Sequence, residues 1–255
     1  MKNILKYIAL TAVRDRFFIT LAMGMLGILG ISTLLGYTAM NEQGMMQTAV
    51  FAGSARILLA GGIAIFICFY LARSFENMEI PFILSGNISR GKLVFTYWLG
   101  FNILTQILLA FLAILMFLSP GKINFWGAVR WFCTVELELA IVIGFCVAVG
   151  LIIKSPVFSA LTTFGFYILA RMMGFFTGLF FSFGDNKIIT AATRALDFLF
   201  RAIASLAPRL DLFGQTVWLT YGGDPKVMTI ILIQSLIYIP LLLLIALHDF
   251  KKKQF

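Results

Sequence analysis

The sequence has few of the residues on which soluble enzymes and metalloproteins depend. Charged residues make up only 12% of the 255 positions, against about 25% in an average soluble domain. One histidine occurs in the whole chain, which argues against His-based metal catalysis and against haem held by two histidines. The three cysteines, Cys68, Cys133 and Cys146, have neither metal-site nor disulfide spacing, so we expect them to be small packing residues.

Apolar residues are present in great excess instead. They make up 61% of the chain, with 27 phenylalanines, and the mean hydropathy is +0.98. A soluble protein of this length could not bury so much apolar surface in one core. The composition therefore predicts an all-α polytopic membrane protein with a single transmembrane domain over residues 1–255.

Six apolar stretches are each long enough to cross a bilayer as a helix, which takes about 20 residues. They are residues 17–37, 51–72, 93–118, 125–153, 157–182 and 228–247. The first stretch follows Arg14-Asp15-Arg16 and is too long for the apolar region of a signal peptide. We therefore interpret it as an uncleaved span.

Basic residues gather at the ends of the predicted spans and predict which ends face the cytoplasm. If the N-terminus is cytoplasmic, the inner segments carry eleven of the 20 basic residues, whereas the outer segments 38–50 and 119–124 carry only Lys122. This distribution follows the positive-inside rule and places both termini on the cytoplasmic side of the cell membrane. Segment 183–227 would be external although it mixes basic and acidic residues, but long loops weigh little in the rule. The net charge of +9 is explained in this way, without nucleic acid as a partner.

Two segments outside the spans have apolar residues at helical spacing. Residues 1–16 predict a helix in the cytoplasmic interface, and a simple extension of the first span is the alternative. Residues 190–206 are too charged to cross the bilayer, so we expect a short interfacial or re-entrant helix that ends before Pro208. Trp218 and Tyr221 are then expected at headgroup depth.

Small residues recur within two spans. Gly24, Gly27 and Gly30 are three positions apart, and Ala140 and Gly144 are four apart. Such spacing allows helices to approach closely. We expect ordinary packing within the chain rather than a dedicated dimer seam.

Five charged residues fall within the predicted spans, where a charge is costly and is a candidate for function by default. They are Arg56, Arg130, Glu136, Glu138 and Arg171. The first two lie near the outer ends of their spans, where their side chains could reach the headgroups. Glu136 and Glu138 lie deeper, on roughly opposite faces of one helix, and one of them is expected to pair with Arg56 or Arg171. Structural pairing and a pathway for substrate or protons both stay open.

Residues 86–92 match the start of a phosphate-binding loop, G-x-x-x-x-G-K. Residue 93 is leucine, however, where a serine or threonine should hold magnesium, and no β-strand is predicted before the match. The signatures HExxH and GxSxG do not occur either. We therefore expect that the chain does not hydrolyse ATP itself.

The connection between the second and third spans is charged and amphipathic. Phe75, Met78 and Phe82 recur at a spacing that would place them on one face of a helix, and Glu76 and Glu79 lie off that face. A plain solvated loop is the alternative. Neighbouring helices need only about 2–8 connecting residues, so a longer ordered connection suggests a function.

Three further residues of this connection, 73–92, predict how it folds. Pro81 suits the first turn of a short helix, and Gly86 can end that turn with a positive φ. Ser89 can cap the next membrane helix. The pattern predicts two short helical pieces separated by a break, lying along the membrane.

The connection resembles the cytoplasmic loop of ABC-2 type transporter permeases, in which an acidic amphipathic stretch leads to Leu-Ser and then to Ile-Ser-Arg. The residues that carry the resemblance are Phe75-Glu76-Asn77-Met78-Glu79-Ile80, Leu84-Ser85, Ile88-Ser89-Arg90 and Lys92. The six spans, the interfacial N-terminal helix and an external helical segment similar to Leu206-Ala207-Pro208 and Phe213 agree with the family. The sequence departs from the family pattern at Pro81 and Gly86, where more continuous helix is expected.

The resemblance implies half of an exporter. Two membrane subunits, identical or related, would pair with two separate ATP-binding cassette ATPase subunits that bind ATP and Mg, while this chain would hold no cofactor. The connection would be a coupling helix seated in the ATPase cleft, where ATP-driven movement would switch access to a substrate. The residues expected to contact the ATPase are Phe75, Glu76, Met78, Glu79, Phe82, Ile83, Leu84, Ser85, Ser89 and Arg90.

Two other classes of function stay open from the sequence. One is an intramembrane enzyme built around Glu136, Glu138 and Arg171, which would work without a partner. The other is a structural membrane subunit that only assembles other chains.

Overall fold

The computed structural model describes residues 2–39, 42–85, 88–119, 121–153, 155–184 and 208–252. Over these residues the chain is built from helices, and no β-strand occurs among them. The protein is an all-α polytopic membrane protein, as the composition predicts, because six helices are long and apolar enough to cross a membrane.

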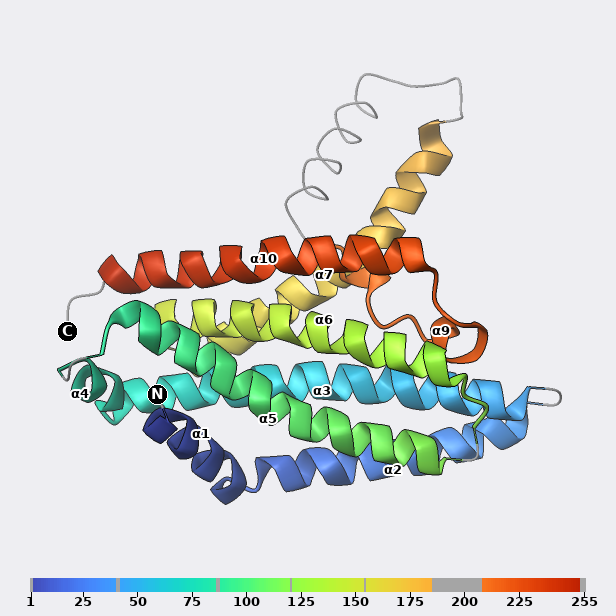
Figure 1. Ribbon diagram of the computed structural model, residues 1–255, viewed down its shortest axis with the longest axis horizontal. Helices are drawn as coiled ribbons and strands as arrows, with labels where there is room; N and C mark the ends of the chain where they lie inside the picture. Colours follow the sequence, from blue (N-terminus) through green and yellow to red (C-terminus); the bar gives the residue numbers. More distant parts are fainter. Residues whose placement is uncertain are drawn as a thin grey trace.

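The long helices pack together in one bundle (Figure 1). In chain order the helices are α1 (Lys2–Arg14), α2 (Phe17–Thr38), α3 (Gln43–Glu76), α4 (Glu79–Ser85), α5 (Arg90–Leu118), α6 (Phe125–Ile152), α7 (Pro156–Gly184), the 3₁₀ helix η1 (Leu210–Leu212), α9 (Val217–Tyr221) and α10 (Pro225–Lys252). The six candidate spans are α2, α3, α5, α6, α10 and Pro156–Phe175 of α7. They coincide with the six predicted stretches, except that α3 begins at Gln43 rather than near residue 51.

The two ends of the bundle differ in what they carry. Helices α1 and α4 and the last turn of α10 lie at one end, which we call the terminal end, and α9 lies at the other, the far end (Figure 1). Helix α1 and the last turn of α10 thus lie at the same end of the bundle. That both termini are cytoplasmic stays a prediction.

Helices α3 and α6 form the centre of the bundle, and α2 and α10 lie at its edge. The most apolar stretch is 72% buried in α3 and 78% buried in α6, but only 17% in α2 and 22% in α10. The outer helices expose many large apolar side chains, such as Leu34, Leu236 and Leu244. Such a surface is stable in hydrocarbon but not in water.

Small residues bring two pairs of spans together. A Cβ atom at Gly24 would lie 2.9 Å from Leu58 of α3, and one at Gly144 would lie 3.6 Å from Leu242 of α10. The expected packing within the chain is confirmed at these two positions. Gly27 and Gly30 have no described atom within 4 Å of a Cβ placed there, so they do not contribute to it.

Helix α1 is separate from the first span. The chain turns at Arg16, whose φ of 53° lies in the left-handed region. Ile8 of α1 is buried against α5, and Asp15 forms a 3.1 Å ion pair with Arg73 at the end of α3. The alternative of a continuous first helix is therefore wrong, and the position of α1 in the membrane interface stays a prediction.

The segment that follows Pro208 folds back against the bundle. Leu210, Phe213, Trp218 and Leu219 are all buried, and the Leu219 carbonyl accepts a 2.7 Å hydrogen bond from the Asn124 N–H. The Trp218 carbonyl packs against Gly127 at the start of α6, and the expectation that Trp218 and Tyr221 lie at headgroup depth stays a prediction. The helix predicted over residues 190–206 lies outside the described residues.

Candidate functional site

The connection between α3 and α5 has the predicted order of helix, break and helix. The break is at Asn77 and Met78, and Met78 has a φ of 57°, which a non-glycine residue rarely adopts. Helix α4 then begins with a hydrogen bond from the Phe82 N–H to the Met78 carbonyl at 3.1 Å. Pro81 lies in the first turn of α4, where its missing N–H costs nothing.

The end of the connection also follows the sequence prediction. The Ser89 hydroxyl accepts a hydrogen bond from the Lys92 N–H at 3.4 Å and caps α5. Gly86 lies outside the described residues, so its predicted role in ending α4 is untested.

The side chains of this connection divide into buried anchors and exposed apolar residues. Ile80 is fully buried, and Phe75, Ile83 and Leu84 are partly buried against the core. Met78 is 67% exposed and Phe82 is 79% exposed. Of the polar residues proposed for partner contact, the exposed ones are Glu76, Ser85 and Ser89.

The predicted common face of Phe75, Met78 and Phe82 is wrong. A single continuous helix would align the three side chains, but the left-handed residue Met78 changes the direction of the chain between them. Phe75 consequently packs inward while the other two point outward. Helix α4 and the break before it thus present an apolar surface, made of Phe82 and Met78, at the terminal end.

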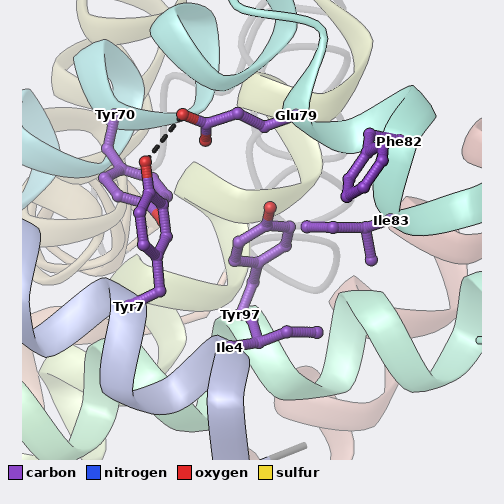
Figure 2. Close-up of a pocket in the computed structure, with 7 residues that line it drawn as sticks. All are labelled: Ile4, Tyr7, Tyr70, Glu79, Phe82, Ile83 and Tyr97. Carbon is purple, nitrogen blue, oxygen red and sulfur yellow. Dashed lines mark hydrogen bonds between the residues drawn. The ribbon is translucent and has the colours of Figure 1, made fainter.

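Glu79 connects α4 to the N-terminal helix. Its Oε1 accepts a 2.7 Å hydrogen bond from the Tyr7 hydroxyl, across 72 positions of sequence (Figure 2). This hydrogen bond, together with burial and the nearby negative charge, raises the pKa of the Tyr7 phenol. Tyr7 occupies an ordinary position in an amphipathic helix, so no local pattern predicts its contact with Glu79.

Arg90 connects the start of α5 to the end of α10. Its Nη1 donates to the carbonyl oxygens of Phe250 at 2.7 Å and of Lys251 at 2.9 Å. Its guanidinium also lies 5.8 Å from the centre of the Phe250 ring. A cation at the C-terminus of a helix satisfies unpaired carbonyls and the negative end of the dipole. Arg90, which we expected to contact a partner, therefore also has a structural role within the chain.

The intramembrane charges form a cluster around Glu138. This side chain is fully buried, and its Oε1 accepts hydrogen bonds from Arg171 at 3.2 Å and from the Tyr167 hydroxyl at 3.0 Å. Arg56 Nε lies 3.9 Å from its Oε2. The prediction that one glutamate pairs with Arg56 or Arg171 is confirmed, and the pairing involves both arginines.

The same arginines bind the segment that follows Pro208. Arg171 donates to the carbonyls of Leu210 at 2.7 Å and Phe213 at 3.1 Å, and Arg56 donates to those of Phe213 and Gly214. Gly214, at a φ of +55°, also accepts from the indole of Trp131 at 3.0 Å. The cluster thus fastens this turn to α3, α6 and α7.

Arg56 does not reach for the headgroups as the sequence suggested. Helix α3 begins at Gln43, so Arg56 lies thirteen residues along it, or roughly 20 Å from its start. Its side chain is buried and pairs with Glu138. The early start of α3 is what the sequence missed, since Gln47 and Thr48 looked like residues of a loop.

Arg130 and Glu136 lie outside the cluster. Arg130 is half-buried and donates to the Gly223 carbonyl at 2.6 Å, which holds the start of α10. Glu136 is exposed on the outward face of α6, whereas Glu138 faces inward, so the predicted opposition of the two glutamates is confirmed. Within the described residues Glu136 has no ion-pair partner.

No family model matches the chain, and no curated protein matches it. The resemblance to ABC-2 permeases therefore depends on the residues of the α3–α5 connection and on the order of the helices.

Proposed function

We propose that the chain is the membrane-spanning permease subunit of an ATP-driven, ABC-2 type exporter. It would work as a homodimer, or beside a related permease, with separate ATP-binding cassette ATPase subunits that bind ATP and Mg. The observation that carries the proposal is the short helix α4 with the break before it, which lie outside the spans and expose Phe82 and Met78. Large apolar side chains on a small helix are what a groove in a soluble partner can hold.

The contacts of α4 support a role in transmitting movement. Helix α3, which enters α4 through a two-residue break, is one of the two central helices of the bundle. Glu79 joins α4 to α1, and Arg90 joins the start of α5 to α10. A displacement of α4 would therefore act directly on α3 and on α1, which is what mechanical coupling requires.

The charge distribution supports the orientation that this function needs. By the positive-inside rule, the basic residues at the ends of the spans favour a cytoplasmic terminal end. Helix α4 would then face the compartment that contains ATP. We propose accordingly that the protein lies in the cell membrane with both termini cytoplasmic.

The arrangement of Glu138 gives the enzyme alternative little support. Its carboxylate is fully buried and is already engaged by Arg171 and Tyr167. These contacts fit the structural interpretation of the cluster better than a reacting group open to a substrate.

The test begins with a search of the genes adjacent to this one for a chain that carries an ATP-binding cassette, followed by reconstitution of the two together. In lipid nanodiscs we expect the permease to bind that subunit and to stimulate its ATP hydrolysis. Phe82→Asp should reduce both binding and stimulation by about tenfold or more, because it places a charge in an apolar contact. Phe125→Asp changes another exposed phenylalanine, at the far end, and should leave both unchanged.

Two results would overturn the proposal. One is the absence of binding to the neighbouring ATPase by a permease that remains folded. The other is a Phe82→Asp variant that stimulates hydrolysis as well as the unchanged protein does.

A further inference from the structure

A pocket of about 360 Å³ opens beneath α4, between that helix, α1, α3 and α5 (Figure 2). Its volume is within the range of small-molecule sites, about 300–1,000 Å³. Four aromatic side chains and one carboxylate contribute to its lining, with two isoleucines between them. They are Tyr7, Tyr70, Glu79, Phe82 and Tyr97. The coupling role proposed for α4 does not involve this pocket.

Two tyrosines form the inner wall of the pocket. Tyr70 of α3 is 6% exposed and Tyr97 of α5 is 1% exposed. Their ring centres are 6.2 Å apart and their planes meet at 72°, an edge-to-face arrangement. A cation is attracted by an aromatic face within about 6 Å of its centre. An ammonium group in the pocket would lie against a wall to which both α3 and α5 contribute an aromatic ring.

The mouth of the pocket adds a negative charge. Glu79 lies above it on α4, with the exposed side chains of Tyr7 and Phe82 on either side (Figure 2). The Tyr7 hydroxyl occupies one site on Oε1, but a carboxylate offers about four acceptor sites. No lysine or arginine is among the lining residues. The chain has a net charge of +9, but the lining of this pocket has one carboxylate and no basic residue, so the pocket favours a cation.

The inner wall also has an unused polar group. Tyr70 Oη is buried and has no hydrogen-bond partner among the described residues. A buried hydroxyl without a partner is unfavourable. The Tyr70 hydroxyl could donate a hydrogen bond to an oxygen atom of a ligand whose ammonium group lies in the pocket.

We propose that this pocket binds a small organic cation whose ammonium nitrogen carries alkyl groups, with an oxygen a few bonds away. Alkyl groups suit the aromatic and isoleucine lining, and the positive charge suits the ring faces and Glu79. An unsubstituted ammonium would leave N–H donors unsatisfied against the rings. Free choline-like cations and the headgroup of a choline lipid both have this chemistry. The binding needs no ATPase, so it stands or falls separately from the proposed transport function.

The first experiment measures binding of radiolabelled choline to the purified chain in nanodiscs of phosphatidylglycerol. We expect saturable binding with one site per chain. The neutral carbon analogue of choline, 3,3-dimethyl-1-butanol, should compete at least about tenfold more weakly, because it lacks the charge. Equal competition by the neutral analogue, or no saturable binding up to millimolar choline, would overturn the proposal.

Variants then test the named groups. Glu79→Gln and Tyr97→Leu should each weaken choline binding by about tenfold. Tyr7→Phe removes the hydrogen bond to Glu79 but keeps the aromatic ring and the charge of Glu79. It should therefore change the affinity for choline little, which would show that Glu79→Gln acts through the lost charge and not through the lost contact with α1. Glu136→Gln and Tyr221→Leu, which change exposed residues remote from the pocket, serve as controls. Wild-type affinity in folded Glu79→Gln and Tyr97→Leu would contradict the assignment.

A second set of nanodiscs distinguishes the two sources of the cation. If the pocket holds a lipid headgroup, discs that contain phosphatidylcholine should lower the apparent affinity for free choline, and the Tyr97→Leu variant should retain less of that lipid on purification. If the pocket selects a free cation, the affinity should be the same in both kinds of disc. Either result upholds the proposed chemistry and names its source.

Discussion

At the scale of single residues, Glu138 organises the middle of the molecule. It is fully buried, and it joins arginines that come from α3 and α7. One carboxylate cannot neutralise two arginines, and the remaining charge is met by the carbonyls of Leu210, Phe213 and Gly214. Removing the carboxylate would therefore leave two guanidinium groups inside the bundle with only neutral partners.

We expect the substitution Glu138→Gln to destabilise the protein by about 3–5 kcal/mol, the usual cost of removing one partner from a buried ion pair. Thermal unfolding in nanodiscs would measure the loss. Glu136→Gln, two positions away on the exposed face of the same helix, is the matched control and should change stability by less than about 1 kcal/mol.

The same pair of variants separates structure from function. If Glu138→Gln kept full stability and lost only transport, the cluster would belong to a substrate or proton pathway, and our structural interpretation would be wrong.

At the scale of the helices, the α3–α5 connection shows which local features the sequence can predict. The cap at Ser89 and the short helix around Pro81 were predicted because each depends on a few neighbouring residues. The common face of Phe75, Met78 and Phe82 was not correct, because it assumed a continuous helix through Met78. Helical spacing alone does not indicate that a methionine will adopt a left-handed conformation.

The contact between Arg90 and α10 lies beyond any local pattern, since 160 positions separate Arg90 from Phe250. A basic residue next to a predicted helix can satisfy the C-terminus of any helix that the fold brings near it. Only the packing of α5 beside α10 determines which helix that is. The same holds for Tyr7 and Glu79, which are brought together by the packing of α1.

Substituting Arg90→Met should loosen the last turn of α10. We expect amide hydrogen exchange there to rise by about fivefold to thirtyfold, which corresponds to about 1–2 kcal/mol of lost local stability. Lys92→Met, two residues along α5 and exposed, should not alter exchange in α10. Unchanged exchange in Arg90→Met would show that these hydrogen bonds contribute little to holding the helix end.

At the scale of the whole molecule, the six spans were predicted well because each needs only a sufficient run of apolar residues. The start of α3 was missed by eight positions. Gln47 and Thr48 are polar, yet both are buried, since Gln47 donates a 3.0 Å hydrogen bond to Ser119 and Thr48 donates to the Gly44 carbonyl at 2.8 Å. Those partners cannot be read from the composition of the segment itself.

The proposed orientation can be tested on intact cells. In a variant whose three native cysteines are replaced by alanine, Met78→Cys and Tyr221→Cys place one thiol at each end of the bundle, both at exposed positions. A maleimide that cannot cross the membrane should label Tyr221→Cys on intact cells and Met78→Cys only after lysis. The reverse pattern would place α4 outside the cell and would rule out coupling to a cytoplasmic ATPase.

The central charge cluster also bears on how the chain is made. Spans enter the membrane in the order of synthesis, so α6 arrives with Glu138 before Arg171 and the turn at 210–214 have left the ribosome. Only Arg56, supplied earlier by α3, is then available to accompany the carboxylate into the hydrocarbon. Of the two arginines that pair with Glu138, the more distant one in the folded protein is thus the first that the chain supplies.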